Sequence, residues 1–170
     1  TNDLTLLPND GCFADLGRSP MKIQGSAVTS YSLGADYFKI TNQKDQLVMY
    51  FENGTFELMA NDGSGTIWGG LGSDGQLTAG GAPISIEEGL YHLVLDDEMK
   101  QLTITSIEEI SVVGDLDWLL DRQLEQDPLN PWFWKGTGFS LETGNIRFRA
   151  NHSWEVSWGD PDLDILLSYG

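Results

Sequence analysis

Hydrophobic and polar residues alternate along this chain in short runs, and glycines, asparagines and acidic residues separate one run from the next. A period of two residues is typical of strands that bury one face, because successive side chains of a strand point to opposite sides. The spacing of the runs suits a β-sandwich. We therefore expect an all-β chain with strands at residues 22–26, 37–41, 46–51, 55–60, 66–69, 76–78, 84–86, 90–95, 101–107, 132–135, 138–141, 145–150 and 153–158.

Two segments carry a more specific local signal. Residues 116–126 place apolar side chains at 116, 119, 120 and 124 with charges between them, which predicts one short helix that Asp127-Pro128 ends. Asn53-Gly54 stands between two of the expected strands, and this dipeptide predicts a tight hairpin because both residues tolerate positive φ.

The chain also repeats itself with a period of about 90 residues, which predicts tandem small domains. Residues 54–61 (GTFELMAN) match residues 144–151 (GNIRFRAN), and Trp68-Gly69 matches Trp158-Gly159 at the same offset. Residues 21–25 parallel residues 110–114. We expect a lead-in or linker over residues 1–20, a first β-sandwich over 21–109 and a second over 110–170.

The second copy is expected to be incomplete, because far fewer residues follow Trp158-Gly159 than follow Trp68-Gly69. A sheet without its edge strands exposes unpaired backbone. Three interpretations are open: the sequence is a fragment, another chain supplies the strand, or the second half is divergent.

Composition narrows the range of partners. The formal net charge is −17, from 26 acidic and 9 basic residues, so the chain repels phosphate and we expect neither nucleic acid nor an anionic membrane surface as a partner. No apolar run approaches the length of about 18 residues that a membrane-spanning helix needs. Cys12 is the single cysteine, which excludes an intramolecular disulfide.

The matched strand at 145–151 separates a core face from an outward face. Alternation sends Ile146, Phe148 and Ala150 inward and Arg147 and Arg149 outward. The first copy keeps the apolar face but has Glu57 and Met59 where the two arginines stand. The arginines either pair with acidic residues on neighbouring strands or donate hydrogen bonds to a ligand, and the sequence leaves both open.

Tryptophan is concentrated in the second copy, which holds five of the six. An aromatic ring can bury the flat apolar face of a sugar while hydrogen-bond donors beside it set the orientation. Each of these tryptophans has packing in the core as its alternative, and Trp158 is expected to be structural because both copies keep it. The candidate ligand-binding residues are Trp118, Trp132, Trp134, Lys135, Arg147, Arg149 and Trp154.

The second copy resembles the repeated carbohydrate-binding domains of SusE and SusF, surface lipoproteins of the starch-utilisation systems of Bacteroidetes. The resemblance is carried by Ile110–Asp115, by Trp132–Gly136 and by Thr143–Asn151 with Trp154 and Trp158-Gly159. In the first copy, Gly89–Asp96 followed by Leu102–Thr105 looks like the closing part of the same domain type.

The resemblance implies a non-catalytic, Ig-like or carbohydrate-binding-module-like sandwich. It implies binding of a neutral polysaccharide, a starch-like α-glucan above others, at a cell surface to which the full-length precursor is anchored through the outer membrane. Other outer-membrane glycan-uptake proteins are the implied protein partners. The alternative is an adhesion or scaffold module that uses the same aromatic face for a protein partner.

Catalysis and metal binding are not expected. The acidic residues are many, yet no spacing singles out a carboxylate pair for glycoside hydrolysis. His92 and His152 have no metal-ligand spacing, and His152 is expected in a turn. Asp160, Asp162 and Asp164 resemble the start of a calcium loop, but the glycine and terminal acid of that loop are missing, so a solvated turn is favoured. No cofactor is expected.

Overall fold

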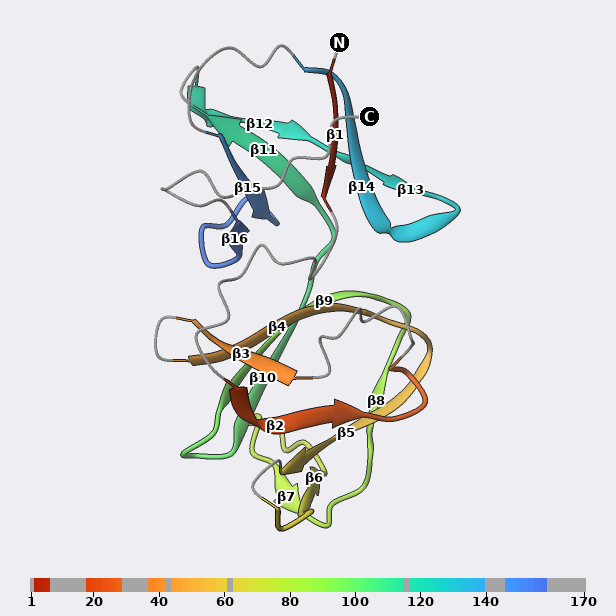
Figure 1. The fold of residues 1–170 in the computed structure, drawn as a ribbon, viewed down its shortest axis with the longest axis vertical. Coiled ribbons are helices and arrows are strands. Elements are labelled where there is room, and N and C mark those ends of the chain that lie inside the picture. The colour runs from red at the N-terminus through yellow and green to blue at the C-terminus, as the bar shows by residue number, and fades with distance from the viewer. Residues whose placement is uncertain are drawn as a thin grey trace. The chain divides into compact units, whose positions relative to one another are not determined.

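The protein is all-β, as the alternation predicts (Figure 1). In this computed structural model the described residues form β-strands and no helix, and the paired strands are antiparallel. The chain divides into two compact units, one of residues 13–106 and one of residues 1–12 with 107–170, and we call them the 13–106 unit and the 107–170 unit. The structure describes residues 2–6, 18–28, 37–41, 44–60, 63–114, 117–139 and 146–158.

The described residues of the 13–106 unit form nine strands, and one of them, β8, lies off the main strand order. Eight follow one another in the order β10-β9-β4-β3-β2-β5-β6-β7, and β8 pairs with β5. Their bounds are β2 (Arg18–Gln24), β3 (Tyr37–Thr41), β4 (Lys44–Phe51), β5 (Gly54–Ala60), β6 (Ile67–Gly69), β7 (Thr78–Ala79), β8 (Ile84–Ile86), β9 (Gly89–Asp96) and β10 (Gln101–Ser106).

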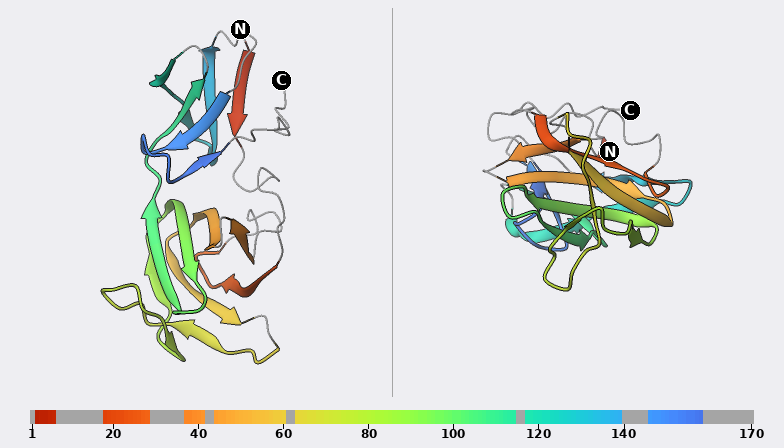
Figure 2. Two further views of the ribbon diagram at one scale, coloured as in Figure 1. Left: turned by 90° about the vertical axis from the view of Figure 1, so that its left-hand side faces the viewer. Right: turned by 90° about the horizontal axis from the view of Figure 1, so that it is seen from below.

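These strands curve around one hydrophobic core (Figure 2). The core joins residues from β2 and β5, such as Ile23 and Leu58, to residues from β4 and β9, such as Met49 and Leu93. Strands that are distant in the sheet order therefore face each other across the core, which is the sandwich-like arrangement that alternation favours.

The Asn53-Gly54 prediction of a hairpin is wrong. β4 pairs with β3 and β9, while β5 pairs with β2, β6 and β8, so the short link between β4 and β5 crosses from one layer to the other. The reason is packing: Phe51 and Phe56 on either side of the link are both fully buried, with ring centroids 5.0 Å apart. Burial of both rings in one core outweighs the local preference for a tight turn.

In the 107–170 unit the residues that the structure describes form two sheets, ordered β12-β11-β15-β16 and β1-β14-β13. The chain passes from the first to the second at Leu124, a buried residue between β12 and β13. The bounds are β1 (Asn2–Leu6), β11 (Ile110–Gly114), β12 (Asp117–Gln123), β13 (Glu125–Asp127), β14 (Asn130–Phe139), β15 (Ile146–Ala150) and β16 (Ser157–Trp158).

The predicted helix at 116–126 is wrong, because β12 and β13 occupy this segment. Its first part pairs with β11 and its last part with β14. Of the four apolar side chains of this pattern the structure describes two, and Leu120 is exposed whereas Leu124 is buried. Backbone pairing with two distant strands decided the outcome, since a helical period over so short a segment is a weak local signal.

The internal repeat appears again in the strand pairing. β2, β5 and β6 of one unit correspond to β11, β15 and β16 of the other, and each pair of strands has the same register at the matched positions. The corresponding partners are Met21↔Ala60 with Ile110↔Ala150, Ile23↔Leu58 with Val112↔Phe148, and Leu58↔Trp68 with Phe148↔Trp158.

The edge of β14 is covered by β1, a strand within the residues that were expected to be a lead-in. β1 pairs with β14 antiparallel, with Thr5 opposite Lys135 and Leu6 opposite Trp134. In the 13–106 unit β9 has the corresponding place beside β4. The strand beside β14 therefore comes from the N-terminal part of the same chain.

Candidate functional site

The site is built on the turn that joins β15 to β16. The backbone of Ser153 donates to the carbonyl of Ala150 at 2.9 Å, and Ala150 donates to the carbonyl of Val156 at 2.9 Å, which closes the turn. Asn151 and His152 have φ of 50° and 54°, the left-handed region that costs a non-glycine residue about 1 kcal/mol or more. Contacts elsewhere must therefore stabilise this turn.

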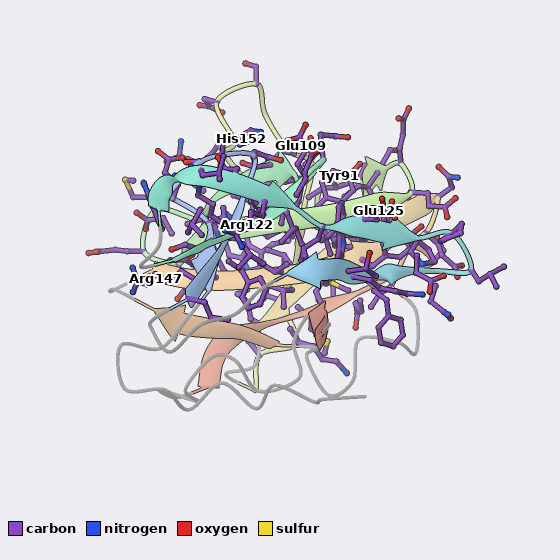
Figure 3. All side chains as sticks on the ribbon, turned by 90° about the horizontal axis from the view of Figure 1, so that it is seen from above. Tyr91, Glu109, Arg122, Glu125, Arg147 and His152 are labelled. Atoms are coloured by element: carbon purple, nitrogen blue, oxygen red, sulfur yellow. The ribbon has the colours of Figure 1, made fainter. Side chains whose placement is uncertain are left out.

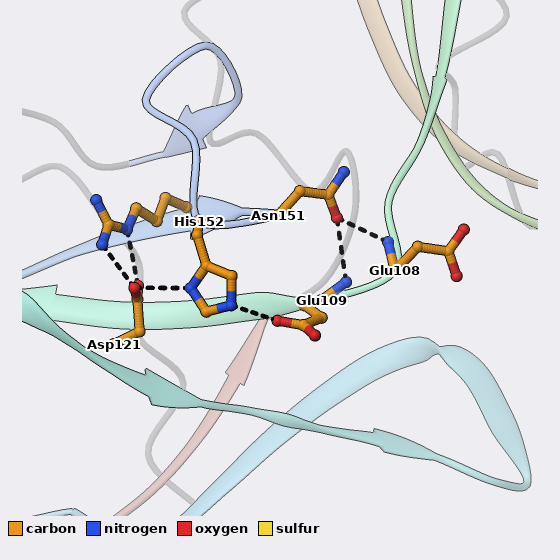
Figure 4. A network of polar contacts seen from close by, with 6 residues as sticks. Glu108, Glu109, Asp121, Asn151 and His152 are labelled. Carbon is orange, nitrogen blue, oxygen red and sulfur yellow. Dashed lines mark hydrogen bonds and ion pairs between the residues drawn. The ribbon is translucent and has the colours of Figure 1, made fainter.

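Asn151 supplies the first of these contacts. Its Oδ1 accepts hydrogen bonds from the backbone N–H groups of Glu108 at 2.9 Å and Glu109 at 3.3 Å, and its own N–H donates to the carbonyl of Glu109 at 2.9 Å (Figure 4). The turn is thus attached to the segment that leads into β11. Asparagine suits this place because it tolerates the left-handed conformation and its amide reaches backbone groups nearby.

Arg149 makes the second contact that stabilises this turn. From β15 its side chain reaches across β11 to Asp121 on β12, with Nε to Oδ1 at 2.7 Å and Nη2 to Oδ2 at 2.6 Å. Ser111 stands opposite Arg149 on the intervening strand, and its small side chain is fully buried. Arg149 is only 8% exposed, so this bidentate ion pair neutralises a charge that burial would otherwise make costly.

His152 joins the same carboxylate to a second one. Its Nδ1 lies 2.7 Å from Oδ2 of Asp121, and its Nε2 lies 2.6 Å from Oε2 of Glu109. Figure 4 shows the imidazole between the two carboxylates. The contact with Asp121 is a hydrogen bond and the contact with Glu109 is a close ion pair, so the two carboxylates favour the protonated form of the ring.

The electrostatics agree with that geometry. Hydrogen bonding to Asp121, and its negative charge, raise the pKa of His152 above its ordinary value of 6.5. The hydrogen bonds from Arg149, opposed in part by burial and helped by those from His152, lower the pKa of Asp121 from 3.8 to about 2. The pKa of Arg149 is raised by its hydrogen bond to Asp121. The three groups therefore hold one another in their charged forms.

Trp154 lies at the outer side of this network. Its side chain is 47% exposed, and the Arg149 guanidinium carbon is 4.7 Å from the centroid of its ring, a cation–π contact. The indole of Trp154 is thus exposed to solvent and lies against the Arg149 guanidinium, which Asp121 holds in place. The chemistry available is stacking on the indole, with imidazole and carboxylate groups nearby for hydrogen bonds.

The other predicted residues are not gathered here. Trp134 on β14 is 5% exposed, so it offers no surface to a ligand; its indole N–H has no hydrogen-bond partner among the described residues. Lys135 forms an ion pair with Asp127, which lowers the pKa of that carboxyl. Arg147 is half-buried, and Figure 3 shows it well apart from His152 and Glu109.

Some candidates fall outside what the structure describes. The side chains of Trp118, Trp132 and Trp158 are among these, as are Asp160, Asp162 and Asp164. Of the predicted ligand-binding residues that are described, Arg149 and Trp154 are brought together, and Arg149 has taken the acid-pairing role that the sequence left open.

Sequence reasoning missed Asp121, Glu109 and the part that His152 takes beyond its expected place in a turn. Asp121 is one of 26 acidic residues, and it was placed in a predicted helix, so nothing local marked it as the partner of Arg149. The useful signal was the difference between the copies: the second has arginines at the positions of Glu57 and Met59 in the first. Arginines on a strand predict acidic partners on a neighbouring strand.

Within the described ranges no group of three histidine, cysteine or acidic side chains is placed to hold a metal ion. The same part of the chain contains no helix long and apolar enough to cross a membrane. The sequence matches no protein-family model and no curated protein, so a functional proposal depends on the chemistry of this site.

Proposed function

We propose that this protein is a non-catalytic glycan-binding protein and that the Trp154 turn of the 107–170 unit is its binding surface. The ligand is a neutral polysaccharide, with a starch-like α-glucan favoured by the resemblance to the SusE and SusF domains. The observation that carries the proposal is the half-exposed indole of Trp154 held over a buried guanidinium.

The exposed aromatic ring of Trp154 suits the apolar face of a sugar. A pyranose ring has a flat face of C–H groups, and an exposed indole buries that face without requiring charge on the ligand. Arg149 is held beneath Trp154 by Asp121, so the ring is set in place before binding and little ordering is needed when the ligand arrives.

The rim of the surface favours neutral ligands. Glu109 and Asp121 lie beside the turn, and carboxylates accept hydrogen bonds from sugar hydroxyl groups but repel uronates and sulfated sugars. The net charge of −17 acts in the same direction over the whole chain. Arg149 contributes by supporting the ring, since two of its nitrogens are already engaged by Asp121.

The difference between the repeats also favours this surface. The two units share strand register at the matched positions, whereas the residues that follow differ: Asn151-His152-Ser153-Trp154 in one and Asn61-Asp62-Gly63-Ser64 in the other. A fold that is kept while one turn gains a tryptophan is what a binding site placed on a common scaffold requires. Attachment to the bacterial outer membrane and partnership with other glycan-uptake proteins belong to the same proposal.

The test is binding of maltooligosaccharides and of a panel of other neutral and acidic glycans, measured by calorimetry and by retardation in native gels that contain the polysaccharide. We expect weak binding of neutral glycans, strong loss of it in Trp154→Ala, and partial retention in Trp154→Phe, which keeps a smaller ring. Leu129→Ala, at an exposed apolar position in the β13–β14 turn, is the matched control and should bind like the natural sequence. Equal binding by the Trp154→Ala variant, or none by the unaltered protein, contradicts the proposal.

A further inference from the structure

We infer that protonated His152 is a positioning residue for Trp154, so that glycan binding at Trp154 weakens as the pH rises and His152 loses its proton. This inference rests on the proposed function and adds a regulation to the same site.

The contacts form an unbroken series from Glu109 to Trp154. Oε2 of Glu109 lies 2.6 Å from Nε2 of His152, and Nδ1 of His152 lies 2.7 Å from Oδ2 of Asp121. Asp121 in turn binds the guanidinium of Arg149, against which the indole of Trp154 lies. His152 is also only two residues from Trp154, within the same turn. Both the ring and the cation beneath it are therefore connected to the imidazole.

The backbone gives these contacts their importance. Asn151 and His152 are both held at positive φ, so the turn would relax toward a commoner conformation if its side-chain attachments were lost. Asn151 attaches the turn whatever the pH, through hydrogen bonds to the backbone of Glu108 and Glu109. The attachment made by His152 depends on its charge, because a neutral imidazole has one N–H and turns a lone pair toward one of the two carboxylates.

The two carboxylates that contact the imidazole favour its protonation, whereas the Arg149 guanidinium, which shares Oδ2 of Asp121 with it, is a like charge that acts against it. Asp121 reaches it from β12 and Glu109 from the segment before β11, while Arg149 on β15 faces Asp121 through its own two hydrogen bonds. Two further acidic residues lie on these segments: Glu155 in the β15–β16 turn, and Glu108 in the segment before β11 to which Asn151 attaches the turn.

The sign of the pH effect follows from the direction of the shift. The pKa of His152 in the folded protein is raised above 6.5, so its attachment is complete below pH 6.5 and is lost as the pH rises through the raised value. Asp121, with its pKa lowered to about 2, stays ionised throughout and adds no titration of its own in this window. A neutral glycan has no titrating group, so any pH dependence belongs to the protein.

The first experiment needs no ligand. The chain has two histidines, His92 and His152, whose ring protons can be followed by NMR titration. The resonances of His152 are assigned as those that disappear in His152→Gln. We expect His152 to titrate above its ordinary value. The fluorescence difference between the natural protein and Trp154→Phe, which reports Trp154, should change over the same range; a signal that stays constant while His152 titrates overturns the inference.

The second experiment measures affinity for maltooligosaccharide from pH 5 upward through the titration. We expect affinity to fall by roughly five- to tenfold, less than the loss of a direct charge-assisted hydrogen bond to the ligand, because His152 acts on the ligand only through Trp154. His152→Gln should bind weakly at every pH, and His152→Arg, which keeps its positive charge, should retain affinity above the titration of the natural protein. A flat profile for the natural protein, or the same profile in His152→Gln, overturns the inference and leaves the proposed function standing. Absence of binding at every pH refutes the proposed function instead.

Discussion

Removing the carboxylate that holds Arg149 is the most direct test of the site. Asp121→Asn keeps the shape of the side chain but leaves a guanidinium that is 8% exposed without its charged partner. Breaking a fully buried ion pair from one side costs about 3–5 kcal/mol. Because the Asp121 side chain is 15% exposed and solvent screens part of the interaction, we expect a loss of roughly 2–3 kcal/mol in the free energy of unfolding.

The depressed pKa of Asp121 leads to a similar figure. A carboxyl whose pKa falls from 3.8 to about 2 on folding stabilises the folded state by roughly 2 kcal/mol at neutral pH. That stability is present above pH 3.8 and is lost as the pH falls through about 2. The natural protein and Asp121→Asn should therefore differ at pH 7 and converge in strong acid.

The assay is denaturant unfolding followed by tryptophan fluorescence at several pH values. Five of the six tryptophans lie beyond residue 110, so the signal reports mainly on the 107–170 unit, while circular dichroism reports on both units. The double-mutant cycle with Arg149→Met isolates the coupling between the two side chains. Asp127→Asn is the control, because its partner Lys135 is well exposed and its loss should change stability far less. A difference below about 0.5 kcal/mol for Asp121→Asn, or one that persists unchanged into strong acid, would refute the ion-pair account.

Three further substitutions test the packing around the site and in the other unit. Ser111→Ala should be neutral or stabilise by up to about 1 kcal/mol, because the buried hydroxyl has no hydrogen-bond partner among the described residues; a clear loss in urea unfolding would mean that it has one. Trp134→Phe should cost less than about 1 kcal/mol, since removal of the unpartnered N–H offsets the lost volume; a larger shift in the unfolding midpoint contradicts this. Gly25→Ala should destabilise the 13–106 unit by more than about 2 kcal/mol, because a Cβ would lie 2.3 Å from the Thr55 carbonyl oxygen at a φ of +140°; circular dichroism should show an earlier transition with the tryptophan transition unmoved.

The alternating pattern was enough to predict the class of fold and the inner face of the matched strand. Phe148 and Ala150 are buried on β15, as Phe56 and Leu58 are on β5. Both results depend on short-range information, because the direction of a strand side chain changes with each residue. The outward placement of Arg149 is wrong, because its ion pair with Asp121 leaves it only 8% exposed, and Ile146 is half-buried. The repeat was equally visible in the sequence, and strand register then agreed with it at the matched positions.

The difference between the two copies also singled out Trp154 and Arg149 as candidate functional residues from the sequence alone. Only the tertiary structure decided what each one does. Arg149 and Asp121 are 28 positions apart and meet because β12 and β15 flank the same central strand. The same dependence on distant partners turned the expected helix at 116–126 into strands and placed β1 beside β14. Strand pairing is a contact between residues far apart in the chain, so local periodicity can say that a strand forms and which side is apolar, but not which strand lies next to it.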